Sequence, residues 1–282
     1  MRPMRSVLLL ATVFACTAAC EAIDRVSDGP ARRSRPAARD VRAPDSEILI
    51  IGRPADAIGL DPARESDNES AEVCEQIFEH LVRSAPDFAD VEPALATSWE
   101  VTDDGRTWTF HLRKGVRFHD GTPFDANAVV FSFERQRDPK HPFHTSGFAY
   151  WNSSFRNIQK IWAVDPATVR IEIDRPYAPF LASMAMFPVS IVSPTAVARY
   201  GDEFPRHPVG TGPFRFTSWV ASERVVLTRN EDYWGPKAWV DKVFLRIVKD
   251  ETVASQLWEK GELDLMTRIQ PGVWRAIELP TA

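Results

Sequence analysis

The chain has 282 residues, of which 44% are hydrophobic and 26% are charged, and its formal net charge is −5. This composition is typical of a folded globular protein of about two domains. The mild negative charge argues against a nucleic-acid-binding protein, because such proteins neutralise phosphates with an excess of lysine and arginine. No stretch beyond the N-terminus is apolar over the roughly 20 residues that a membrane-spanning helix needs.

The first 19 residues form a targeting segment. Two arginines precede an apolar run at 7–15, and small residues follow up to Cys20. The run is too short to span a bilayer, as in a secretion signal. The segment resembles a bacterial lipoprotein signal, which would make Cys20 the lipidated first residue of the mature chain. An ordinary signal peptide is the alternative, because Thr17 stands where lipoprotein signals usually carry leucine.

Residues 20–46 are rich in Arg, Ala, Pro and Asp and show no apolar periodicity, which predicts a flexible tether. Cys16 would leave with the signal and Cys20 would carry lipid, so Cys74 has no disulfide partner. Cys74 lies in a helical pattern, where a small buried core residue is the simplest interpretation.

The hydrophobic pattern of the first half predicts strands and helices in alternation. Strands are expected at 47–52 and in a hairpin over 99–112, and helices at 69–82 and 125–138. Asp103-Asp104-Gly105 predicts the hairpin turn, since glycine adopts positive φ without steric cost. Asp125 is the expected N-cap of the second helix.

The second half continues in the same way after an aromatic, loop-like stretch at 141–155. Strands are predicted at 158–164, 168–173, 189–192, 214–216, 225–227 and 243–248. Helices are predicted at 177–186, 193–200 and 252–260, the last ending at Gly261.

Several short motifs lie along this framework. They are Leu60-Asp61-Pro62, Leu95-Ala96-Thr97-Ser98-Trp99-Glu100, Phe110-His111-Leu112-Arg113-Lys114-Gly115, Phe118-His119-Asp120-Gly121-Thr122-Pro123-Phe124, Pro208-Val209-Gly210-Thr211-Gly212-Pro213-Phe214, Tyr233-Trp234-Gly235-Pro236 and Gly261-Glu262-Leu263-Asp264-Leu265. Together they resemble the peptide-type (dipeptide, oligopeptide, nickel) solute-binding proteins of ABC importers, bacterial extracellular solute-binding protein family 5. The resemblance covers nearly everything from Ile48 onward.

The resemblance implies an α/β fold, the N-terminal lobe of a periplasmic-binding-protein-like architecture (class II, cluster C). Residues 47–75 and 186–268 would form a discontinuous ligand-binding lobe I, and 76–185 an inserted small α/β domain II. Residues 269–282 would begin lobe III. Family members are considerably longer, so we expect a truncated chain whose second lobe is largely absent.

The function that the resemblance implies is that of an extracytoplasmic receptor without catalysis or cofactor. It would capture a small solute, an oligopeptide, between two closing lobes and deliver it to an ABC permease in the inner membrane. We expect a monomer in the periplasm or at the cell surface, held to a membrane by lipid at Cys20. With one lobe, we expect weak binding, since good sites bury most of their ligand.

The same resemblance implies two groups of ligand-binding residues. Asp67 and Asn68 follow Leu60-Asp61-Pro62, and Met266, Thr267 and Arg268 follow Asp264-Leu265. They would supply mainly backbone hydrogen bonds to an extended ligand, and Arg268 could pair with a ligand carboxylate. The alternatives are helix capping for Asp67 or Asn68 and a solvated surface charge for Arg268.

A different class of protein, a secreted lipoprotein with enzymatic or chaperone-like activity on this scaffold, is the alternative function. No histidine lies in a recognisable nucleophile motif, and Gly-x-Ser-x-Gly does not occur. His141 and His144 are three apart, but Pro142 disfavours the helix that would align them, so we predict no metal site.

Overall fold

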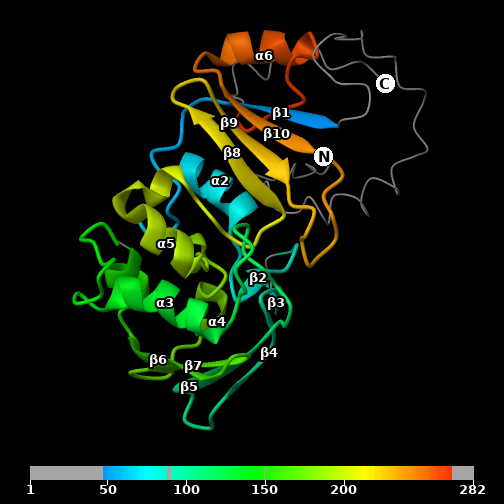
Figure 1. Ribbon diagram of the computed structural model, residues 1–282. Coiled ribbons are helices and arrows are strands. Elements are labelled where there is room, and N and C mark those ends of the chain that lie inside the picture. The colour runs from blue at the N-terminus through cyan, green and yellow to red at the C-terminus, as the bar shows by residue number, and fades with distance from the viewer. Residues whose placement is uncertain (1–46, 88–89, 149, 269–282) are drawn as a thin grey trace, which may run out of the picture.

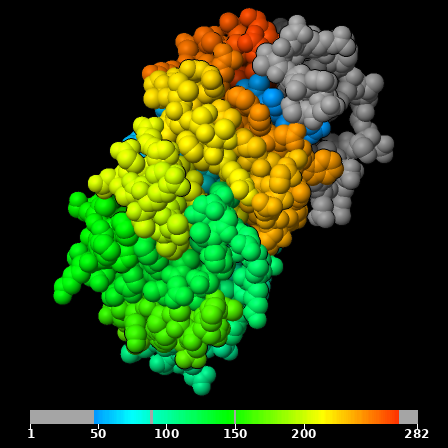
Figure 2. Space-filling model, viewed as in Figure 1, coloured from blue at the N-terminus to red at the C-terminus, as the bar shows by residue number. Residues whose placement is uncertain are grey.

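The computed structural model describes residues 47–87, 90–148 and 150–268. They form two main sheets at opposite ends of one elongated body, with several helices between them (Figure 1). Figure 2 shows the two ends in direct contact along a continuous surface. Strands and helices follow one another along the chain, and the strands form sheets packed with helices, which confirms the predicted α/β class. None of the described helices has the length and apolar character needed to cross a lipid bilayer.

The larger sheet has five strands. They are β1 (Ile48–Arg53), β8 (Phe214–Val220), β9 (Arg224–Arg229), β10 (Lys242–Ile247) and β11 (Leu265–Met266). The strand order is β11-β1-β10-β9-β8, with β1 parallel to both of its neighbours and β10, β9 and β8 antiparallel. The apolar run at 48–51 fits this interior place, since Ile51 lies in the buried core beside the sheet and Leu49 packs partly buried against the same core.

Two helices accompany the larger sheet. They are α2 (Asn68–Ile77) and α6 (Glu251–Glu259). Val73 and Ile77 of α2 lie in one buried core with Ile51 of β1 and Val225 of β9. The free thiol of Cys74 is buried in that core, as its helical pattern indicates, and burial raises its pKa.

The smaller sheet has four antiparallel strands. They are β4 (Ala96–Val101), β5 (Thr107–Leu112), β6 (Ile158–Asp165) and β7 (Thr168–Ile173), in the order β4-β5-β7-β6. Helix α3 (Ala126–Arg137) packs against β6 and β7. The predicted hairpin and helix start are confirmed: Gly105 has φ +68°, and Asp125 Oδ1 accepts from the Ala128 backbone N–H at 3.0 Å.

Shorter elements connect the sheets. They are β2 (Val82–Ser84), β3 (Val91–Pro93), a π-helix (Trp151–Phe155), α4 (Phe180–Ser183), a 3-10 helix (Phe187–Val189), α5 (Pro194–Tyr200) and a second 3-10 helix (Gly201–Arg206). The helix predicted at 177–186 is therefore wrong in length, and part of the loop-like stretch at 141–155 is helical. The strand predicted at 189–192 is wrong as well, because only Ile191 bridges to Glu79. Pro188 disfavours a strand there, since proline has no backbone N–H for a ladder.

The helix predicted at 69–82 ends at Ile77, and Phe78 after it is extended. The cause is Glu79, whose buried carboxylate accepts from three side chains distant in sequence. Thr211 Oγ1 donates at 2.8 Å, Tyr233 Oη at 2.9 Å and Trp234 Nε1 at 2.9 Å. Burial raises the pKa of Glu79 to about 7, although the three hydrogen bonds lower it.

Close packing at the end of α2 explains why the motif at 208–214 has a glycine at position 210. A Cβ on Gly210 would lie 2.1 Å from the backbone oxygen of Ile77, so any side chain there would clash with main-chain atoms. The motif at 208–214 and Tyr233-Trp234 thus pack against the end of α2 and the extended residues that follow it.

A buried ion pair links the loop after β1 of the larger sheet to α3, which packs against the smaller sheet. Asp61, in the loop after β1, accepts from Arg135 of α3: Oδ2 lies 2.8 Å from Nη1, and Oδ1 lies 2.6 Å from Nη2. The Arg135 guanidinium also lies over the rings of Phe148 and Phe204. The boundaries expected for lobe I and the inserted domain II stay predictions, although each main sheet falls within one of these two segments.

Candidate functional site

The candidate site lies at the edge of the larger sheet, where β1 and β11 end. Gly52 pairs with Met266 in parallel register, and the backbone N–H of Thr267 donates to Gly52 O at 3.1 Å. Asp264 ties the start of this pairing to Ile50: its N–H donates to Ile50 O at 2.8 Å, and its Oδ2 accepts from Ile50 N at 2.9 Å. Residues 266–268 therefore leave the sheet beside the carboxyl end of β1, the end at which open α/β sheets commonly bind ligands.

The N-terminus of α2 forms the other side of the site. Asp67 is its N-cap, since Oδ1 accepts from Ser70 N at 2.8 Å. One of its two carboxylate oxygens therefore has the capping role considered as an alternative above. The other oxygen, Oδ2, is buried and has no hydrogen-bond partner among the described residues. Asn68, the first residue of the helix, is exposed. A helix N-terminus favours negative charge, because unpaired N–H groups point outward there.

An ion pair brings the two groups of predicted residues together. Arg268 Nη2 lies 3.5 Å from Glu69 Oε1, one residue after Asn68. The Arg268 side chain is 56% exposed, and Met266 and Thr267 are half-buried. The structure therefore places Asp67, Asn68, Met266, Thr267 and Arg268 around one sheet edge, although they are some 200 residues apart in sequence.

The sequence analysis did not identify Arg53, the last residue of β1. Its side chain is fully buried; Nη2 donates to the backbone oxygen of Glu69, and Nε lies 3.4 Å from Glu72 Oε2. Nη1 has no hydrogen-bond partner among the described residues. Burial lowers the pKa of Arg53, and Glu72 and Glu69 oppose that change. The signal that could have found it is an arginine at the carboxyl end of an apolar strand.

Several carboxylates lie near the N-terminus of α2, and burial raises the pKa of two of them. Burial, followed by the charges of Asp67 and Asp61, raises the pKa of Glu65 to about 7. Burial also raises the pKa of Glu72, although Arg53 lowers it. The site thus places the exposed Arg268 beside the carboxylates of Glu69 and Glu72, an arrangement that suits a zwitterionic ligand.

Backbone groups complete the site. β11 pairs with β1 on one side only within the described part of the chain, so its other edge is open to an added strand. No group of three or more His, Cys, Asp or Glu side chains in that part could hold a metal ion. The segments expected to be the signal, the tether with Cys20 and the start of lobe III lie outside the described residues.

Comparison with known proteins places this geometry in context. The family profile described as bacterial extracellular solute-binding proteins, family 5 Middle, matches residues 90–281. Heme-binding protein A of Haemophilus influenzae is 32% identical over 93% of this chain and 50% of its own length. Di/tripeptide-binding protein 2 of Pseudomonas aeruginosa is 36% identical over 80% of this chain and 46% of its own length.

A solved structure shows the same arrangement. The ABC transporter-associated periplasmic binding protein DppA from Helicobacter pylori, in complex with the peptide STSA, superposes with a TM-score of 0.78 and 38% identity. The match covers 83% of this chain and 49% of that protein. The chain therefore spans about half the length of the relatives that it matches.

Proposed function

We propose a function from one premise: the chain belongs to the bacterial extracellular solute-binding proteins, family 5. It acts as an extracytoplasmic receptor of an ABC importer, capturing a small peptide and delivering it to a permease without catalysis. Peptide is the ligand class because relatives named for di- and tripeptides and a neighbour solved with a peptide are among the most similar. None of the relatives described above supports the enzymatic or chaperone-like alternative.

The observation that carries the proposal is the meeting of residues 67–69 and 266–268 at one open sheet edge. An extended peptide added to β11 would make main-chain hydrogen bonds there, which bind a peptide without reading its side chains. Asp67, Asn68, Met266 and Thr267 line this edge. Arg268 is exposed and its ion pair with Glu69 is 3.5 Å long, so it can exchange Glu69 for a ligand carboxylate.

The remaining features of the proposal concern the setting of the protein. Residues 1–19 act as the signal, Cys20 carries lipid, and 20–46 tether a monomeric receptor to a membrane on its periplasmic or outer side. Residues 47–75 with 186–268 form the ligand-binding lobe, and 76–185 form the inserted domain. Family membership supports a periplasmic or extracellular location. Capture and release need no metal or cofactor.

Calorimetric titration of trialanine and of its C-terminal amide onto the purified chain tests the role of the site. If Arg268 pairs with the ligand carboxylate, Arg268→Gln weakens trialanine binding about tenfold or more and leaves amide binding unchanged. Arg246→Gln is the matched control, because Arg246 is also exposed and makes one long ion pair, 3.9 Å to Glu262. Hemin serves as a second ligand, given the name of one relative.

Equal losses for Arg268→Gln and Arg246→Gln would refute the assignment of Arg268. Binding of hemin but not of either peptide would refute the peptide proposal while leaving the receptor function in place.

A further inference from the structure

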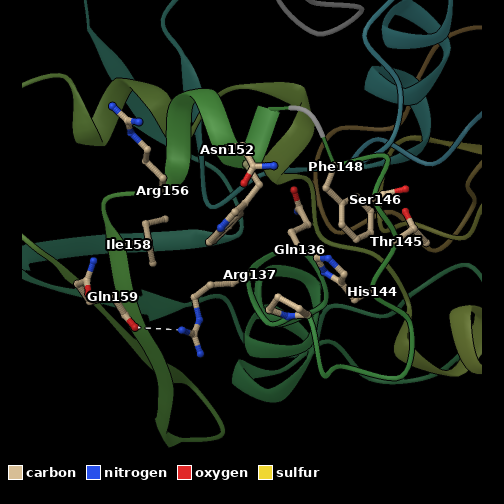
Figure 3. Close-up of a pocket in the computed structure, with 12 residues that line it drawn as sticks. Gln136, Arg137, His144, Thr145, Ser146, Phe148, Asn152, Arg156, Ile158 and Gln159 are labelled. Atoms are coloured by element: carbon tan, nitrogen blue, oxygen red, sulfur yellow. Dashed lines mark hydrogen bonds between the residues drawn. The ribbon is translucent and has the colours of Figure 1, made fainter.

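A cavity lies beside the smaller sheet, among the residues drawn in Figure 3. Its volume is about 470 Å³, within the range of small-molecule sites. Its walls come from the end of α3, the stretch after it, the π-helix Trp151–Phe155 and the first residues of β6. None of its lining residues belongs to the candidate site, so the following inference does not depend on the proposed function.

An unpaired buried acceptor lies at the base of this cavity. Gln136 is 2% exposed; its Nε2 donates to Ser132 O at 3.2 Å and to Pro188 O at 3.0 Å. Those two bonds fix the amide, and Oε1 has no hydrogen-bond partner among the described residues. Figure 3 shows the side chain directed towards Asn152 and Phe148. Because buried acceptors are nearly always paired, this oxygen indicates a missing donor.

His144 provides a second acceptor on the same wall. Its Nδ1 lies 3.0 Å from Arg135 O and must donate, because a carbonyl only accepts. In the neutral ring, Nε2 is then an acceptor. Two acceptors beside the exposed amide of Asn152 match a ligand that carries hydroxyl groups, since a hydroxyl can donate and accept.

The charges around the cavity have one sign. The lining residues include Arg137 and Arg156 but no aspartate or glutamate. Arg137 is engaged, with Nε donating to Glu134 Oε2 at 2.9 Å and Nη1 to Gln159 O at 3.3 Å, the dashed line of Figure 3. Arg156 lies at the rim, exposed, with its head group pointing outward. It has no ion pair within the described ranges, so its charge is free to attract an anion.

The π-helix supplies an independent indication. Such helices are rare and occur frequently at functional sites. Here the turn is held by Trp151 and Phe155, both buried, with the Trp151 ring 6.2 Å from that of Phe133. The conformation places Asn152 in the cavity wall.

We propose that this cavity is a second binding site, for a small hydroxylated organic anion. Its hydroxyl groups would donate to Gln136 Oε1 and His144 Nε2, and its carboxylate would lie at the rim near Arg156. This site is separate from the sheet edge at β11, so one chain could hold both ligands at once.

Titration of the isotope-labelled chain with gluconate, followed by NMR, tests the proposal. Gluconate combines a carboxylate with hydroxyls, sorbitol has only the hydroxyls, and acetate has only the carboxylate. We expect gluconate to shift the Asn152 side-chain amide and the Trp151 indole N–H, and to bind about tenfold more tightly than either partial analogue. Arg156→Gln should weaken gluconate binding severalfold, and Asn152→Ala should weaken gluconate and sorbitol alike.

Arg175→Gln is the matched control, an exposed arginine outside the cavity, and should bind gluconate as the parent does. Because Arg156 and Asn152 are both exposed, neither change is expected to disturb folding. The proposal is overturned if gluconate at about 10 mM leaves both signals unshifted, because a Kd near that concentration would already be weak for such a site. It is also overturned if sorbitol binds as tightly as gluconate, or if Arg156→Gln and Arg175→Gln behave alike.

Discussion

Replacing Arg135 with methionine tests how the two sheets are held together. The Arg135 side chain is 2% exposed and that of Asp61 is 4% exposed, and two short hydrogen bonds join them. Removing one partner leaves the other charge buried without compensation, which costs about 3–5 kcal/mol. For a chain of this size, a loss of that order lowers the melting temperature by roughly 6–20 °C.

The matched control is Arg83→Met. Arg83 also donates through Nε and Nη2 to a carboxylate, Glu92 Oε2, but these side chains are 50% and 38% exposed. An exposed pair of this kind contributes about 0–1 kcal/mol, because water solvates both charges.

Urea unfolding followed by circular dichroism measures the free energy of unfolding in each variant. Asp61→Asn removes the charge without removing the contacts of Arg135 to Phe148 and Phe204, so it separates electrostatics from packing. The double variant Asp61→Asn/Arg135→Met should lose clearly less than the sum of the two single losses, because neither buried charge remains. If Arg135→Met costs no more than Arg83→Met, or if the two losses simply add, the argument from burial is wrong.

Three further predictions concern the region where the two ends of the molecule meet. Gly210→Ala should destabilise the protein by about 1–3 kcal/mol in urea unfolding, since its Cβ would clash with the backbone of Ile77. Trp234→Phe removes the N–H donor to buried Glu79 and should cost about 1–3 kcal/mol in the same assay. Burial lowers the pKa of His119 to about 4 from 6.5, so the neutral ring stabilises the fold above pH 6.5 and this contribution is lost as pH falls towards 4. Between pH 7 and pH 4 the stability of the parent relative to His119→Gln should fall by about 3 kcal/mol.

The first two of these changes have a matched control within the chain. Gly147→Ala should be nearly neutral, because its added Cβ would make only ordinary contact, 3.5 Å from Thr145 Oγ1. Trp239→Phe should be neutral as well, since Trp239 is 70% exposed. A parent and a His119→Gln variant with parallel pH profiles would contradict the pKa argument.

Much of the fold could be predicted because the residue patterns that determine individual strands and helices lie within a few neighbouring positions. The alternation at 107–112 requires a strand with one buried face, and Asp125 is a good cap for the apolar stripe that follows. In the motif at 208–214, Gly210 and Gly212 lie so close to the backbone of Ile77 that a Cβ at either position would clash. The helix predicted to run to residue 82 failed for the opposite reason. Glu79 is drawn out of the helix by partners 132 to 155 positions later, which no local pattern reveals.

The two proposed binding sites depend on tertiary structure in the same way. The sequence, through its resemblance, named residues 67–68 and 266–268, but only the pairing of β11 with β1 and the ion pair from Arg268 to Glu69 bring them together. Arg53 is buried nearby, against Glu69 and Glu72 of α2. In the sequence, Gln136 is simply a polar residue within a predicted helix. Only packing buries its amide and leaves Oε1 without a hydrogen-bond partner among the described residues. Periodicity is a property of neighbouring residues and can be read along the chain. Burial and the meeting of distant charges arise only when the sheets pack, because they depend on which remote groups displace water.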